Sequence, residues 1–515
     1  MKKFVVLSLI SFLILAFGAT VYGQEKAPVL EFKASGFMDV ISEYKQNVPQ
    51  PGAATSANGP TSTNSVVYGA PPAYMRPHLN GVGDQSFDKK EAYMEGRGRL
   101  KFDAIMGKEV SGTFQFEFDS TRWGERAPAG AQRNYSGHWG VSDRSSLELK
   151  HMYFAFGLPW IPVPTTIQAG IQPIGIRPSI FLSTDGPAIT AAFKIDPAYV
   201  KLIWAKALEN RDWAGDDDDV YGIEANAKIS TFTLGGYWVL FNFNSYPHTV
   251  EGVPGYRADV WWAGLYLDGK LGPVNLNFDF CYDDGTIEDR RQAVAARAKD
   301  VDLSGWGAIL NVGFPWEKFL FGFSSIYGTG ADQKKTAAVP LPGAATPWGT
   351  NTTKVKAFLA PGGTEGSNTH AMVLDGAGIN RGNSGFEPAN DNHGRAGQGG
   401  LWINKIYAGF TVSPKFSTRI EGMYVRDTTK NGNTIGNALN AAGRPINDSD
   451  VGWEIDWYNT LTIYKNLTFQ FGGGYLFAGD AMDYNVLTAA GAAINGNNKS
   501  PKNPWIFVTN LTYSF

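Results

Sequence analysis

The 515-residue chain lacks several features by which common protein classes are recognised. It has one cysteine, Cys281, so an intramolecular disulfide cannot form. After Ala19 no apolar run approaches the roughly 20 residues that a membrane-spanning helix needs. The formal net charge is -3, without the basic excess of nucleic-acid binders. These absences exclude a disulfide-stapled scaffold, a bundle of transmembrane helices and a nucleic-acid-binding domain.

Catalytic and metal-binding patterns are also absent. The 6 histidines show no metal-ligand spacing, and none pairs obviously with a nucleophile. The acidic run from Asp216 to Asp219 does not have the carboxylate spacing of a known calcium loop. We therefore expect no enzyme, no cofactor and no metal site.

The chain is rich in glycine and in aromatic residues, which occur in alternating apolar and polar stretches. It contains 61 Gly and 13% aromatic residues, and its mean hydropathy is -0.21. Alternation gives a strand one apolar face without a long hydrophobic run. Short turns and long loops alternate between the stretches along the chain. This pattern predicts an all-β fold, a transmembrane antiparallel β-barrel of about 16–18 strands with short periplasmic turns and long extracellular loops.

The N-terminal residues have the layout of a secretory signal. Met1-Lys2-Lys3 is followed by an apolar segment, 4–19, and by small residues ending at Gly23. We expect residues 1–23 to be cleaved during export through the periplasm and 24–515 to form a multi-pass barrel in the cell outer membrane. Long loops are expected at about 47–90 and 329–400, the second being either a mobile extracellular loop or a lid over the mouth.

The hairpin expected at 91–122 indicates which face of the wall is wet. Arg97, Arg99 and Lys101 alternate with apolar neighbours such as Leu100 and Phe102, so they share one strand face. A Lys or Arg that faces lipid at mid-membrane costs about 2–4 kcal/mol, so this face is predicted to look into the barrel.

Acidic residues on the second strand of this hairpin extend the argument. A three-residue turn would set Arg99 across from Glu117 and Arg97 across from Asp119, pairs that stabilise by about 0.2–1 kcal/mol each. Applied along the chain, the same reasoning predicts one set of pore-lining residues around water. They are Glu95, Arg97, Arg99, Lys101, Glu117, Asp119, Glu224, Lys228, Asp279, Arg419, Glu421, Glu454 and Asp456.

Two stretches, 198–207 and 258–267, are apolar on both faces. Such strands are expected where protomers pack together or where a loop folds back onto the wall.

The final strand carries a family resemblance. WIFVTNLTYSF places Phe515, Tyr513 and Leu511 on one face, broken at Thr509, and resembles the closing strand of Gram-negative outer-membrane β-barrels. SSLELKHMYFAFG, followed by TIQAGIQPIGIRPS, is similar to porin segments that precede the third loop. The resemblance implies a homotrimer in lipid and lipopolysaccharide, inserted by the barrel assembly machinery. It also implies that the third loop, about 174–186, folds inward with Arg177 and Asp185 as constriction residues.

These observations favour an outer-membrane porin, a water-filled channel for passive diffusion of ions and small hydrophilic solutes. Two alternatives stay open: a substrate-specific porin for a sugar or an anion, and a barrel sheath for a periplasmic electron carrier. The sheath would need a wide lumen.

Deleting Phe515 should hamper insertion, because the resemblance identifies Phe515 and Tyr513 as part of the signal that assembly machinery reads. Surface levels of the truncated chain, measured beside the full-length protein, test this. Equal levels of the two proteins would contradict it.

Overall fold

The computed structural model describes most of the barrel wall and parts of its connections. The described residues are 29–48, 89–123, 147–177, 181–209, 212, 215–246, 256–290, 300–330, 332, 335–336, 350–351, 354–358, 371–376, 400–436, 438–487 and 493–515. The expected signal peptide and most of the expected loop 47–90 lie outside them. Within this part of the chain no helix has the length and apolarity needed to cross a membrane.

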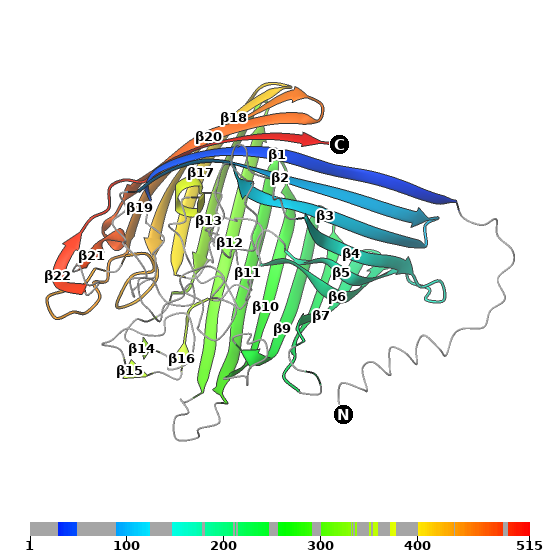
Figure 1. Cartoon of the computed structure of the whole chain (residues 1–515), viewed down its shortest axis with the longest axis horizontal. Helices are drawn as coiled ribbons and strands as arrows, with labels where there is room; N and C mark the ends of the chain where they lie inside the picture. The colour runs from blue at the N-terminus through cyan, green and yellow to red at the C-terminus, as the bar shows by residue number, and fades with distance from the viewer. Residues whose placement is uncertain are drawn as a thin grey trace, which may run out of the picture.

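In the described residues, eighteen long strands form one closed antiparallel barrel. They are β1 (Leu30–Val48), β2 (Lys89–Met106), β3 (Val110–Arg122), β4 (Leu147–Gly157), β5 (Thr165–Ile176), β6 (Leu182–Ile195), β7 (Ala198–Leu208), β8 (Asp218–Ile229), β9 (Phe232–Tyr246), β10 (Tyr256–Leu271), β11 (Val274–Asp289), β12 (Val301–Trp316), β13 (Phe319–Gly328), β17 (Leu401–Ser413), β18 (Phe416–Asp427), β19 (Asp450–Tyr464), β20 (Leu467–Ala478) and β23 (Trp505–Ser514). Each pairs with the next, and β1 also pairs with β23, as the blue and red strands of Figure 1 show. The predicted fold class is confirmed.

Smaller elements belong to the connections on the long-loop side. Three two-residue strands, β14 (Lys335–Thr336), β15 (Thr350–Asn351) and β16 (Lys354–Val355), precede the short helix α2 (Met372–Gly376). A hairpin of β21 (Tyr484–Leu487) and β22 (Ala493–Lys499) follows the 3-10 turn η4 (Asp480–Met482) before the last strand.

The seam of the barrel uses the last residue of the chain. The backbone N–H of Phe515 donates to the carbonyl of Gly36 at 3.0 Å, and the N–H of Gly36 donates to the carbonyl of Phe515 at 2.9 Å. Tyr513 lies across from Met38 in the same ladder. The terminal strand therefore satisfies the free edge of β1 from Gly36 to Gln46.

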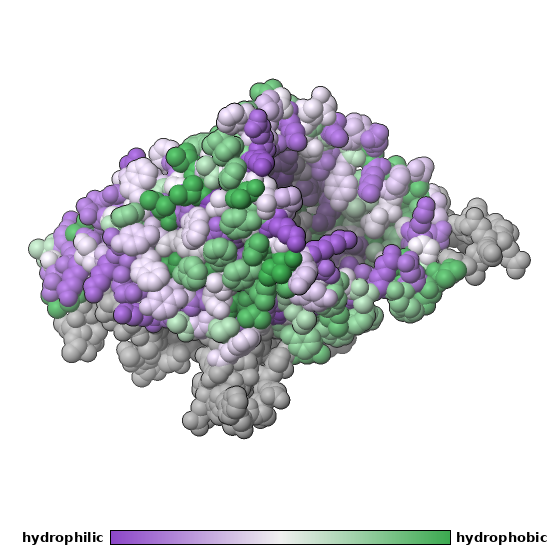
Figure 2. Space-filling model, turned by 90° about the horizontal axis from the view of Figure 1, so that it is seen from above, coloured by the Kyte–Doolittle hydropathy of each residue, from purple (hydrophilic) through white to green (hydrophobic). Residues whose placement is uncertain are grey.

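Aromatic rings gather near both ends of the outer wall. Beside the short turns, Phe319 stacks on Phe410 with ring centroids 4.8 Å apart, and next to Trp316 at 6.0 Å. Toward the long loops, Trp306 stacks on Tyr327 at 4.5 Å. Figure 2 shows, on one face, hydrophobic patches in the middle and hydrophilic residues toward one end and around a hollow. Two aromatic belts flanking an apolar band are typical of strands that face lipid.

The β5–β6 hairpin covers part of the inner wall. Its tip buries Ile176, Phe181 and Leu182 in one apolar cluster with Val260 and Trp262 of β10. Ile203 and Ala205 of β7 belong to the same cluster. We gave two explanations for strands that are apolar on both faces: contact between protomers, or a loop that folds back onto the wall. The structure shows the second, because the hairpin packs on the inner faces of β7 and β10.

The third connection is shorter than the sequence suggests. We expected a loop at about 174–186, but β5 continues to Ile176 and β6 begins at Leu182, with Ile174 paired to Thr184. Pro173, Gly175 and Pro187 obscure the alternation of these strands in the sequence. The loop is only the tip of a long hairpin.

The long connection before β17 also contributes to the interior. Ala357 and Phe358 are buried in the first apolar cluster, and Val373 and Leu374 of α2 are buried in a second one with Leu476 of β20. These four residues of the long connection thus pack against the wall.

Two tyrosines lock β9 to β10 from the inside. Tyr237 pairs directly with Gly264, and Tyr266 pairs directly with Gly235. A Cβ added at Gly264 would overlap the Tyr237 ring, and one added at Gly235 would overlap the Tyr266 ring. Each ring occupies the space that its partner glycine leaves open, so these two glycines are required by packing.

Gly264→Ala should therefore lower barrel stability by about 1–3 kcal/mol, the usual cost of forcing extra volume into a packed site. Gly422→Ala is the control, because a Cβ there meets no atom within 4 Å. The stability of each variant is measured as the temperature at which the protein shifts from its folded to its unfolded position on a gel. Equal midpoints for the two variants would contradict the packing argument.

Candidate transport pathway

Glu117 is the centre of a cationic cluster on the inner wall of β2, β3 and β4. Its carboxylate is 3.1 Å from Nε of Arg97, 2.8 Å from Nε of Arg99 and 3.2 Å from Nζ of Lys150. Glu117 itself is only 3% exposed. Three cations thus share one buried acceptor, and Lys150 has Asp185 as a second one.

The register of this hairpin agrees with the prediction at one pair. Arg99 lies across from Glu117, as predicted. The ladder is irregular between Gly96 and Gly98, where one residue of β2 stands opposite two residues of β3, so it assigns Arg97 no single partner. Arg97 contacts Glu117, and the side chain of Asp119 lies outside the described part of the chain, so the predicted pair of Arg97 and Asp119 stays a prediction.

Asp185 lies close to the same cluster. Its carboxylate is 2.6 Å from Nζ of Lys150 and 2.7 Å from Nε2 of His151, while Nδ1 of His151 is 3.0 Å from Oε1 of Gln115. A register shift in β4 sets two consecutive residues, Lys150 and His151, against one acid. The two predicted constriction residues therefore separate, since Asp185 contacts β4 and Arg177 does not.

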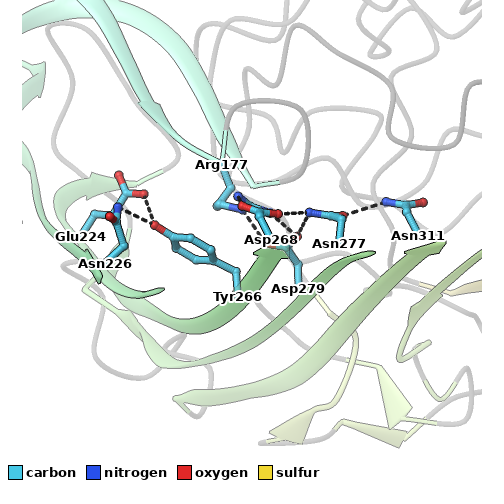
Figure 3. A network of polar contacts seen from close by, with 8 residues as sticks. All are labelled: Arg177, Glu224, Asn226, Tyr266, Asp268, Asn277, Asp279 and Asn311. Atoms are coloured by element: carbon cyan, nitrogen blue, oxygen red, sulfur yellow. Dashed lines mark hydrogen bonds and ion pairs between the residues drawn. The ribbon is translucent and has the colours of Figure 1, made fainter. Parts of the chain in front are cut away.

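Arg177, at the hairpin tip, reaches across the interior to strands that are not neighbours of β5 or β6 (Figure 3). Its Nε and Nη2 donate to the two oxygens of Asp279 at 2.7 and 2.6 Å, and Nη2 donates to Asp268 at 3.0 Å. The guanidinium also lies 4.2 Å from the centroid of the Tyr266 ring. Two carboxylates and one aromatic face thus surround a single cation.

The guanidinium of Arg177 stays protonated. Burial alone would lower the pKa of this guanidinium, but its hydrogen bonds with Asp279 and Asp268 outweigh burial and raise the pKa. The side chain remains a cation at every pH at which the barrel would work.

A row of polar side chains continues from this clamp along the inner wall, across β8, β10, β11 and β12. The Tyr266 hydroxyl donates to Glu224 at 2.9 Å and accepts from Asn226 at 3.0 Å. Asn277 donates to Asp268, and Asn311 donates to Asn277 at 2.8 Å. Carboxylate, amide and hydroxyl groups make this wall acidic, in contrast to the wall around Glu117.

A third charged group lies on β17, β18 and β19. Nζ of Lys405 is 2.9 Å from Glu421, which also pairs with Arg419. On β19, Glu454 accepts the backbone N–H groups of Val373 and Leu374 at 2.6 and 3.0 Å, and Asp456 accepts that of Met372 at 3.0 Å. Glu454 and Asp456 therefore hold α2 on the wall, and both are fully buried.

Three predicted residues belong to none of these groups. Glu95 is half-buried in β2 across from Ile41, Lys101 pairs with Asp103 at 3.1 Å, and Lys228 is exposed beside the short turn after β8. In the described residues no group of three or more His, Cys, Asp or Glu side chains is placed to hold a metal ion.

Sequence reasoning missed Lys150, His151, Tyr266, Asp268 and Lys405. Lys150 and His151 were missed because a bulge breaks the alternation on which the face assignment depends. Asp268 and Tyr266 share a face with Gly264, so the alternation of β10 contains their signal.

We compared the chain with known protein families, curated proteins and solved structures. A scan against protein-family models finds no match, and a search of curated proteins finds none either. Among solved structures, Pseudomonas aeruginosa OccK8 (OprE) is 10% identical with a TM-score of 0.46, and the alignment covers 94% of this chain and 98% of that one. Pseudomonas aeruginosa OccK5 (OpdH) is 9% identical with a TM-score of 0.45 over the same shares. Acinetobacter baumannii OccAB4 is 11% identical, with a TM-score of 0.43 and coverage of 94% and 98%.

Sequence identities and TM-scores this low say nothing about function. The class of protein is therefore defined by features of this chain alone. Closed antiparallel pairing, an apolar outer band and ionisable groups on the inner face define a β-barrel of the transmembrane type.

Glu117→Gln should shift ion selectivity toward anions, because three cations would keep their positions and lose the charge that balances them. The reversal potential in a salt gradient across a planar bilayer measures the shift. Glu288→Gln is the control, since Glu288 pairs with Arg290 near the long-loop end of β11 and both side chains are exposed. An unchanged reversal potential for an assembled Glu117→Gln barrel would contradict the assignment of this cluster to the pathway.

Proposed function

We propose that this protein is an outer-membrane porin, a channel for passive diffusion of ions and small hydrophilic solutes. The observation that carries the proposal is the separation of faces around a closed ring: apolar residues outside, and ion pairs and amides inside on many strands. Only an aqueous or protein-filled interior tolerates so many ionisable groups.

The pathway we propose runs between three charged groups of the inner wall: the cationic cluster around Glu117, the acidic row that includes Asp279, and the group around Glu421. Charged rings and patches set selectivity in such pores. Since these groups oppose one another in sign, we expect modest ion preference in the wild-type channel.

The β5–β6 hairpin and α2 occupy part of the interior, which favours small solutes. A substrate-specific porin remains the second candidate, supported by the two walls of opposite charge that a solute would meet together. A sheath for an electron carrier is not proposed, because that role needs the space that these inward segments fill.

We further propose that the barrel inserts through the barrel assembly machinery, contacts lipopolysaccharide and lipid in the outer membrane, and forms a homotrimer. The outward aromatic belts support the membrane contact. No enzymatic activity forms part of the proposal.

Purified protein that shows a heat-modifiable gel band should give stepwise conductance in a planar bilayer, and its liposomes should swell in small sugars but not in large ones. A matched preparation boiled before reconstitution serves as the control. Absence of conductance from protein with the folded band would overturn the proposed function.

A further inference from the structure

The turn between β4 and β5 differs from the other short turns in the described part of the barrel. It covers residues 158–164, Leu-Pro-Trp-Ile-Pro-Val-Pro, and carries no charged side chain. The other seven turns on this rim have two or three residues, and six of those seven contain a charged, amide or hydroxyl side chain. Trp160, in the middle of the β4–β5 turn, is 44% exposed. The turn is therefore an apolar projection on a rim that is otherwise polar.

The β4–β5 turn has a defined shape. The N–H of Ile161 donates to the carbonyl of Leu158 at 3.1 Å, which closes a β-turn with Pro159 at its second position. Three prolines within seven residues fix further backbone angles. The backbone thus holds the exposed indole of Trp160 away from the wall, so the exposure of this ring is built into the turn.

The backbone of the turn is suited to a medium poor in water. Its three prolines bring no N–H group that would need an acceptor. The carbonyl of Val163 accepts from Oγ1 of Thr165 at 2.8 Å, and the carbonyl of Pro164 accepts from the N–H of Lys194 at 3.0 Å. Each backbone group that is absent or already bonded lowers the cost of moving the turn out of water.

The apolar surface of the turn continues the lipid-facing surface of the wall. Phe154 and Phe156 lie on the outer face of β4, with stacked rings 5.9 Å apart between centroids. Phe156 is paired with Val110, the first residue of β3, which is also exposed. On β3 the chain then becomes polar in the turn 107–109, whereas on β4 the next outward position is Leu158, already in the apolar turn.

We propose that the β4–β5 turn is a membrane anchor, which seats in the periplasmic leaflet of the outer membrane with Trp160 at the boundary between headgroups and acyl chains. The proposal rests on the proposed outer-membrane function and adds a lipid contact made by a turn. Indole rings favour this boundary, because one part of the ring is apolar and the N–H is polar. Since the turn carries no charge, its partner is the apolar part of a phospholipid, and the contact does not depend on salt.

A fluorescent probe in the turn tests the anchor without measuring conductance. Val163→Cys in a Cys281→Ser background places one thiol in the turn and keeps Trp160. The thiol is labelled with an environment-sensitive fluorophore, and protein with the folded gel band is reconstituted into vesicles of phosphatidylethanolamine and phosphatidylglycerol. Quenching is measured with nitroxide-labelled phospholipid and, separately, with iodide on both sides of the membrane.

Lys108→Cys in the same background is the matched control. It lies in the neighbouring turn, 107–109, and the two turns are joined by a bond of 3.0 Å from the N–H of Gly157 to the carbonyl of Glu109. We expect the ratio of lipid quenching to iodide quenching to be about tenfold higher at the Val163 position, since burial of one large apolar side chain shifts an equilibrium by about that factor. The ratio should be the same in low and high salt.

Two further changes in the Val163→Cys protein separate the anchor from a purely structural role of the turn. Trp160→Asn should lower the ratio toward the control value, while Trp160→Phe keeps an apolar ring and should retain most of it. If Val163→Cys does not give the folded band, Pro162→Cys carries the probe, because Pro162 is exposed in the same turn.

Equal ratios at the two turns would overturn the anchor. A turn probe that neither iodide nor nitroxide lipid quenches would overturn it too, because the turn would then be covered by protein, such as a second copy of the chain. Lipid contact in a barrel that does not conduct would leave the anchor standing and remove the channel function. Conductance with a probe exposed to water would remove the anchor alone.

Discussion

Backbone hydrogen bonding around a closed ring is the constraint on which the rest of this structure depends. In hydrocarbon every unpaired N–H or C=O costs several kcal/mol, so a wall of strands must end on itself. Here β1 accepts β2 on one edge and β23 on the other, down to the reciprocal bonds between Gly36 and Phe515. Once the ring is closed, successive residues of a strand point alternately to the outside and to the inside of the barrel.

This alternation explains why charged side chains are concentrated in the interior. It also explains why they are paired there, because inward side chains of neighbouring strands lie next to one another. Sequence reasoning placed Arg97, Arg99 and Glu117 on one water-facing side of the wall and expected ion pairs between the two strands of the hairpin. The structure has them in one cluster, with Glu117 almost fully buried beneath its cations. Pairing across neighbouring strands lowers the cost of desolvation, so an interior can be charged, partly dry and still stable.

The sequence was sufficient for the architecture because period-two alternation and loop lengths are local signals. Closure and a strand number within the expected range follow from them. Local signals were insufficient where the ladder is irregular. The irregular register between Gly96 and Gly98 leaves Arg97 without a single partner across the ladder, and the shift in β4 brought Lys150 and His151 against one acid. Contacts across the interior, such as Arg177 with Asp279, depend on the curvature of the whole ring, which no window of sequence contains.

Inward-facing acids of the barrel wall also hold the segments that fold into the interior. Residues that alternation marks as facing water, Glu454 and Asp456, are used to hold the backbone of α2, and Asp279 is used to hold Arg177. Each acid thus exchanges water for a donor of the same chain. A pore-facing carboxylate is therefore an attachment point that a loop can occupy or leave. The apolar cluster around Phe181 and the ion pair at Arg177 hold the same hairpin through separate contacts, so weakening one leaves the other in place.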